Sequence, residues 1–178
     1  MFKRIFTVLS IGLFSLPLFA QEPTTGPVID GYGNSFFVED RSIPLIPDHV
    51  YRVVYEITAY NGSPDSVNLQ LDRVARFLNM HGKNGVPTEN MPLAVVVHGG
   101  ALINMLNDVS YQERFETKNP NMELLQKLSA AGVEFYACGQ SMAGRGFAKS
   151  ELASPVHLAL SAMTMVHQLQ DEGYTLQP

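Results

Sequence analysis

Residues 93–100 read LAVVVHGG, and this stretch decides the fold class of the chain. The run from Leu93 to His98 is almost entirely apolar, which is typical of a strand buried on both faces of a parallel sheet. It passes directly into Gly99-Gly100 and then into a short expected helix over residues 101–106. A buried strand that feeds a glycine turn and a helix favours an α/β fold.

The segments on either side extend this pattern. Four more segments are rich in β-branched, aromatic or other apolar residues and are expected to be strands: residues 50–58, 133–137, 156–161 and 174–176. Helices are expected from Ser63-Pro64-Asp65 to Gly82, over 119–132 and over 163–172, whereas the polar residues 107–118 are expected to form a loop. Strands that alternate with helices predict a three-layer α/β sandwich with a mostly parallel sheet of about five strands.

The N-terminal 20 residues have the features of a secretory signal peptide. Lys3 and Arg4 precede an apolar run over residues 5–19, and Ala20 is a small residue before a polar segment. At about 15 residues, the run is shorter than the roughly 20 that a membrane-spanning helix needs. We therefore expect cleavage after Ala20 and a periplasmic or secreted protein.

Two segments follow the expected cleavage point. Residues 21–48 contain four prolines and several glycines, which predicts an extended arm, with one short strand at residues 36–38. Residues 49–178 then form the α/β domain. No internal stretch is long and apolar enough to span a membrane, so we expect no membrane association after signal cleavage.

The charge of the chain restricts its partners. The formal net charge is −5, and removal of Lys3 and Arg4 makes the mature chain more acidic by two charges. The remaining Lys and Arg residues are scattered, so they offer no basic patch for nucleic acid or anionic lipid. We expect no nucleic-acid partner.

Cys138 is the only cysteine, and it lies at the end of an expected strand. One cysteine cannot form an internal disulfide, so the thiol is buried and inert, joined to another chain, or reactive. In parallel α/β sheets the ligand site lies beyond the carboxyl ends of the strands, which favours a functional thiol here. The candidate catalytic residue is therefore Cys138, and the candidate binding residues follow two such strand ends: His98, Gly99, Gly100, Gly139, Gln140, Ser141 and Arg145.

The residues after Cys138 suit a thiolate. A cysteine at a strand-to-helix turn lies in the field of backbone N–H groups, and these favour the charged, reactive form. Arg145 could supply a nearby cation, or it could equally be a solvated surface arginine with no role at the thiolate. Gly139, Gly144 and Gly146 would let the backbone bend closely around the sulfur, or be ordinary loop glycines.

The segment GVEFYAC at residues 132–138, followed after six residues by Arg145-Gly146, resembles the DsrE/DsrF-like family. This family includes sulfur-relay subunits and YchN-like proteins, and the resemblance covers about residues 50 to 177. It implies a DsrE/YchN-like fold for the domain and a Cys138 that accepts sulfane sulfur as a persulfide. It also implies a homo-oligomer, a trimer or hexamer, and a sulfur donor or acceptor that is a protein or a small sulfur compound. The export signal argues against a cytoplasmic tRNA-thiolation role.

Three alternatives stay open. The same fold could be a non-catalytic oligomeric module that binds a small ligand around His98 and Cys138. Residues 139–143, GQSMA, approximate the nucleophile elbow of a serine hydrolase, in which Ser141 would need His157 or His167 and Glu151 as partners. Cys138 and His98 would supply only two ligands to a metal, so we expect no metal and no cofactor.

Overall fold

The computed structural model describes residues 21–60 and 62–177, so the expected signal peptide lies outside the described residues. Within those ranges five strands form one sheet in the order β4-β3-β2-β1-β5, and every neighbouring pair is parallel. The predicted α/β fold is confirmed, and the described sheet is parallel throughout. The strands are β1 (Val53–Ile57), β2 (Leu93–Val97), β3 (Glu134–Cys138), β4 (Val156–Ala159) and β5 (Thr175–Gln177).

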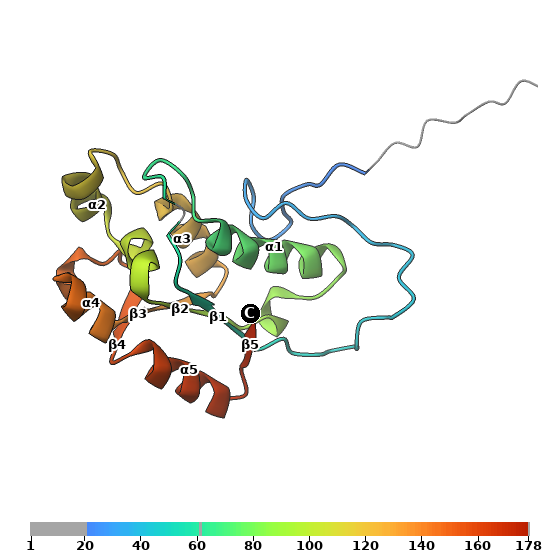
Figure 1. Ribbon diagram of the computed structural model, residues 1–178. Helices are drawn as coiled ribbons and strands as arrows, with labels where there is room; N and C mark the ends of the chain where they lie inside the picture. Colours follow the sequence, from blue (N-terminus) through green and yellow to red (C-terminus); the bar gives the residue numbers. More distant parts are fainter. Residues whose placement is uncertain (1–20, 61, 178) are drawn as a thin grey trace, which may run out of the picture.

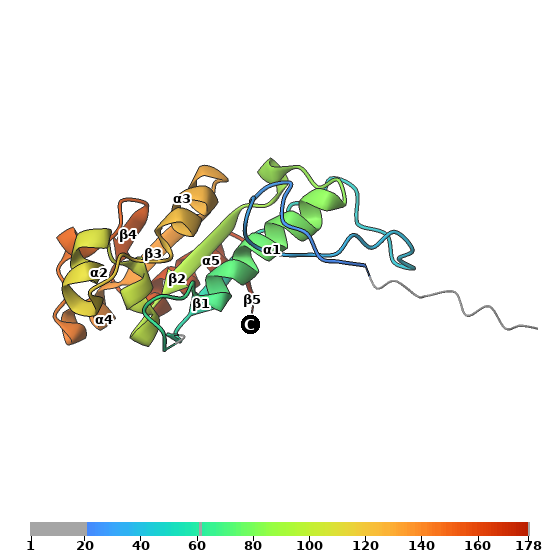
Figure 2. The same cartoon turned by 90° about the horizontal axis from the view of Figure 1, so that it is seen from above.

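Helices cover both faces of this sheet (Figures 1 and 2). Helices α1 (Leu69–Lys83) and α3 (Met122–Ala130) lie on one face, and α5 (Ala162–Asp171) lies on the other. Helices α2 (Asp108–Phe115) and α4 (Gly139–Arg145) lie toward the end of the sheet where the strands finish. Short 3₁₀ turns complete the elements: η1 (Thr88–Asn90), η2 (Gly99–Met105) and η3 (Lys149–Glu151).

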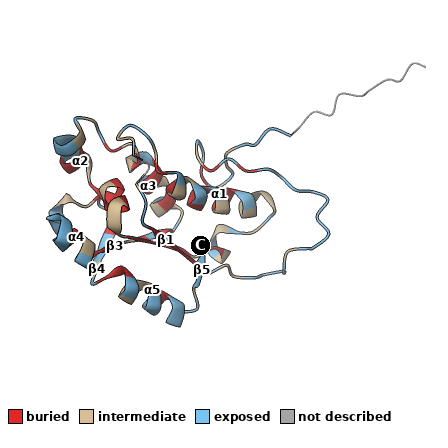
Figure 3. Ribbon diagram, in the orientation of Figure 1, coloured by how far each residue is buried: buried red, intermediate tan, exposed pale blue. Residues whose placement is uncertain are grey.

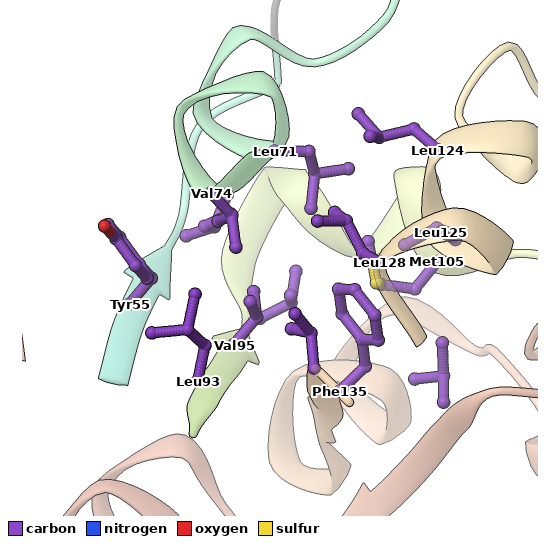
Figure 4. Close-up of a cluster of buried hydrophobic side chains, with 14 of the residues drawn as sticks. Tyr55, Leu71, Val74, Leu93, Val95, Met105, Leu124, Leu125, Leu128 and Phe135 are labelled. Atoms are coloured by element: carbon purple, nitrogen blue, oxygen red, sulfur yellow. The ribbon is translucent and has the colours of Figure 1, made fainter. Parts of the chain in front are cut away.

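The two faces of the sheet bury different amounts of apolar surface. Side chains alternate between the faces along each strand, so β2, which is buried at all five positions, contributes to both cores. The larger core lies under α1 and α3, with Leu71, Val95, Leu128 and Phe135 among its members (Figure 4). The smaller core lies under α5 and consists of Val54, Ala94, Val96, Cys138, Ala162 and Leu169. Figure 3 shows the buried strands between these layers.

Helix α1 begins later than its sequence predicted. The Ser63-Pro64-Asp65 signal is not used, and Asn68 caps the helix through its side-chain oxygen, which accepts a hydrogen bond from Gln70 N at 2.8 Å. Asn68 is fully buried, and its polar groups are satisfied there: its backbone N–H donates to Asn121 Oδ1 and its side chain donates to Ala59 O. A tertiary contact with the segment before α3 therefore sets the start of α1.

The prediction that residues 107–118 form a loop is wrong, because most of this segment is helix α2. Asn107 caps this helix by accepting from Ser110 N at 2.9 Å, and Tyr111 is completely buried. The Tyr111 hydroxyl donates to Pro64 O at 3.0 Å. Two buried positions, Ser110 and Tyr111, hold the helix to the domain, which is too few for a visible apolar repeat in the sequence.

The first part of the arm is hydrogen-bonded to α1 by Asp72, Asn79 and Lys83, of which Asn79 is fully buried. The buried Asn79 amide accepts from the backbone N–H groups of Val28 and Ile29 and donates to the carbonyls of Ile29, Tyr32 and Gly33. Residues 36–38 do not form the expected strand. The pairing found in the described part of the arm is one antiparallel bridge between Thr24 and Ser35.

Residues 36–46 of the arm carry several exposed apolar side chains, among them Phe36, Phe37 and Ile43. No helix in the described part of the chain is long and apolar enough to cross a membrane.

Candidate functional site

The candidate site lies where β1, β2 and β3 end. Strands β2 and β3 pair in register as far as Val97 and Ala137, so the next residue on each strand is His98 and Cys138. Neighbouring strands are about 4.8 Å apart, which puts these two residues side by side. Both point to the α5 face, because Cys138 packs in the smaller core and His98 is two positions beyond Val96 of the same core.

Cys138 is 5 % exposed and lies at the N-cap position of α4, next to the first turns of α4 and α5. Burial raises the pKa of the thiol. The Ser141 side chain and the backbone N–H groups of Ser141, Ala162 and Gln140 lower it, and together they outweigh the burial, so the net pKa lies below the usual value. The donors come from the first turns of α4 and α5, which both begin next to the sulfur.

Gly139 lets these two helices meet. A Cβ atom at this position would lie 2.7 Å from Ala159 O, closer than real Cβ atoms approach a backbone oxygen, and 3.1 Å from Leu160 O, which is a tight contact. Any other residue would push the connection between β4 and α5 outward. Ala162, the first residue of α5, directly follows that connection, so Gly139 helps to keep its N–H next to the sulfur.

Ser141 joins the two strand-end turns. Its hydroxyl accepts from Gly99 N at 3.4 Å, and the same side chain lowers the pKa of Cys138. Gly99 has φ = +59°, a left-handed conformation that favours glycine. Gly100 lies next to the chain that follows β1, where a Cβ atom would be 3.6 Å from Thr58 O.

His98 is held by a residue that sequence reasoning missed. Its Nε2 lies 3.0 Å from Glu56 Oε1, and the two side chains are 31 % and 35 % exposed. Glu56 is the charged position of the otherwise uncharged strand β1, VVYEI. A charge on a strand of a buried parallel sheet is unusual, and this was the signal available in the sequence.

The remaining candidate residues lie farther out. The Gln140 side chain is exposed, and this residue contributes its backbone N–H to the sulfur. Arg145 is exposed in the last turn of α4, about 10 Å along the helix from Cys138 at 1.5 Å per residue. The structure thus gathers Cys138, His98, Gly99, Gly139, Gln140 and Ser141, with Arg145 at the edge of this group.

The alternative constellations are not assembled. Glu151 accepts from Arg114 and from the backbone of Ala148, while His157 packs on the ring of Tyr136. His167 lies 3.8 Å from Asp171 on α5. The serine-hydrolase reading therefore lacks both its acid and its base near Ser141. Among residues 21–60 and 62–177, no three His, Cys, Asp or Glu side chains converge on a point that could hold a metal ion.

Comparison with known families agrees with this architecture. A family model described as the DsrE/DsrF-like family matches residues 52–178, which include every residue of the candidate site. The chain belongs to the DsrE/DsrF-like family. The predicted resemblance is thereby confirmed.

Two solved structures are similar to this DsrE/DsrF-like chain. The first is MTH1491 from Methanobacterium thermoautotrophicum, a protein described as of unknown function, with a TM-score of 0.54 and 21 % identity. The second is the ychN protein from E. coli, with a TM-score of 0.51 and 18 % identity. Each likeness covers 71 % of this chain and 97 % of the other. At these identities the likeness shows a shared fold. No curated protein matches the sequence of this chain.

Proposed function

We propose that this DsrE/DsrF-like protein carries sulfane sulfur as a persulfide on Cys138. The observation that carries the proposal is the position of the buried Cys138 thiol at the start of α4 and beside the start of α5, where Ser141 and the backbone N–H groups lower its pKa. The thiolate is the nucleophile in sulfur exchange, so this environment favours the reactive form. Membership of a family that includes sulfur-relay subunits supports the same chemistry.

The transfer step is an exchange at sulfur. The Cys138 thiolate attacks the terminal sulfur of a donor R–S–SH, a bond forms between the two sulfur atoms, and the donor S–S bond breaks. The electron pair of the broken bond leaves on R–S⁻, which then takes up a proton. The products are Cys138–S–SH and R–SH, so the step needs no outside oxidant or reductant. Attack by an acceptor thiolate on Cys138–S–SH would pass the sulfur on in the same way.

The burial of the thiol restricts its partners. With 5 % of Cys138 exposed, a donor must present one sulfur atom at the end of an extended group. A small sulfur compound or a cysteine on a flexible protein segment meets this requirement. The signal-like N-terminus supports a periplasmic or secreted location, and the family resemblance supports assembly as a trimer or hexamer. Both belong to the proposal.

The test is intact-mass spectrometry of the mature protein after incubation with polysulfide or an alkyl persulfide. We expect a mass increase of one sulfur atom that a reducing thiol removes. Cys138→Ser should show no increase and should keep the fold. The matched control is Ser110→Ala, which changes a buried residue of α2 that is not among the groups acting on Cys138 and should load like the wild type.

The burial of Cys138 also favours a second candidate, a non-catalytic module that uses the same strand ends to bind a small ligand. In that case Cys138 would resist alkylation in the folded protein and would take up no sulfur. Slow alkylation combined with an unchanged mass would overturn the persulfide proposal and leave the binding module as the better account.

A further inference from the structure

The Glu56–His98 pair lies on the same sheet face as Cys138, one strand away. His98 Nε2 lies 3.0 Å from Glu56 Oε1, and Glu56 reaches it from β1, on the side of β2 opposite to β3. The three side chains therefore follow one another across the ends of β1, β2 and β3. Glu56 and His98 are each about one-third exposed, so a ligand that reaches Cys138 can also contact the pair.

The pairing fixes which ring nitrogen handles protons. A carboxylate only accepts hydrogen bonds, so Glu56 accepts from Nε2–H of His98. The proton exchanged with a ligand is then the one on Nδ1. A carboxylate in this position also orients the ring, as in other His–carboxylate pairs.

We propose that His98 is the acid that protonates the thiolate leaving a sulfur donor, and that Glu56 is the residue that positions it. The inference rests on the proposed function for its biological context, but it concerns any exchange reaction at Cys138. The Cys138 thiolate attacks one sulfur of R–S–S–R, a bond forms between Sγ and that sulfur, and the donor S–S bond breaks. Its electron pair departs on R–S⁻, and Cys138 is left as the mixed disulfide Cys138–S–S–R. The Nδ1 proton of His98 passes to R–S⁻ and gives R–SH and neutral His98. His98 then regains a proton from solvent.

This role predicts a dependence on the leaving group. Alkyl thiols have a pKa of about 8.5 and gain from protonation as they leave, whereas an aromatic thiolate of low pKa leaves well without it. Full-length mature protein is therefore treated with 2-hydroxyethyl disulfide and with an activated nitrophenyl disulfide, and the rate of Cys138 modification is measured for each. In His98→Asn and Glu56→Gln the ratio of the aromatic rate to the alkyl rate should rise at least about tenfold, the lower part of the range for acid catalysis.

The ratio is an internal measure, because partial unfolding or a distorted Cys138 pocket alters both rates together. The matched controls are His167→Asn and Asp171→Asn, which remove the other His–carboxylate pair, on α5, and should keep the wild-type ratio. An unchanged ratio in both His98→Asn and Glu56→Gln overturns the inference, whether or not the protein loads with persulfide. A raised ratio in a protein that takes up no sulfur supports the pair and overturns the persulfide function instead.

Discussion

The two faces of the sheet differ in what they bury. The face under α1 and α3 holds a large apolar core that includes Phe135 and Leu128, both fully buried. The face under α5 holds a small core in which Cys138 is a member, with Glu56 and His98 at its open end. The same strand β3 serves both, because alternate residues point to opposite faces. One face therefore supplies most of the stability, and the other is left to carry polar and reactive groups.

The largest expected effect comes from the stabilising face. Phe135→Ala removes a fully buried aromatic ring and should lower the free energy of unfolding by about 3–5 kcal/mol, measured by chemical denaturation. The milder Phe135→Leu should stay folded and keep the alkylation rate of Cys138 near that of the wild type. A large change of that rate in Phe135→Leu would show that the two faces are not independent.

The next largest loss in the free energy of unfolding is expected at the contact between α4 and the end of β4. In Gly139→Ala the added Cβ meets Ala159 O at 2.7 Å, so we expect a loss of about 1–3 kcal/mol from overpacking. The displaced Ala162 N–H should also raise the pKa of Cys138, seen as a shift of the alkylation midpoint to higher pH. Gly144→Ala in the same helix is the matched control: its Cβ has open space, and it should be neutral or stabilising by up to about 1 kcal/mol.

The prediction with the smallest expected change in the free energy of unfolding concerns Ser141, which lowers the pKa of Cys138. Ser141→Ala removes the side-chain donor and should move the pKa of Cys138 upward, toward the value of an ordinary thiol. Iodoacetamide alkylation measured against pH reports this midpoint. Ser110→Ala, a change of a buried serine on α2, should leave it in place, and an unmoved midpoint in Ser141→Ala would mean that the backbone N–H groups alone set the pKa.

The same depressed pKa links stability to pH. Because the folded pKa of Cys138 lies below that of the unfolded chain, the thiolate contributes stability at pH values above the unfolded pKa of about 8.5. That contribution is lost as the pH falls through the folded pKa. Compared with Cys138→Ala, the wild type should therefore gain stability as the pH rises through this window, and the gain should shrink in Ser141→Ala.

The sequence predicted the sheet well because its strands have a local signal. Residues 93–97 and 135–138 are apolar or aromatic runs that lead into glycine turns, and the placement of Cys138 and His98 at strand ends followed from them. The start of α1 was predicted wrongly and α2 was predicted to be a loop. Both depend on Asn68 and Tyr111, which act through contacts with residues far along the chain. The charge of Glu56 within an apolar strand was visible in the sequence, but its partner His98 and the Ala162 N–H beside the sulfur depend on strand order and register, which the sequence does not show.

The contact of Asn79 with residues 28–33 bears on where the folding unit starts. The sequence suggests a domain that begins at residue 49, yet the Asn79 amide lies in the interior and takes its hydrogen-bond partners from the arm. A fragment cut at residue 49 would leave that amide unsatisfied, at about 1–3 kcal/mol for each stranded group, and would uncover the apolar surface that Ile29 now seals. In evolutionary terms, Asn79 and the arm residues that it contacts are expected to change together.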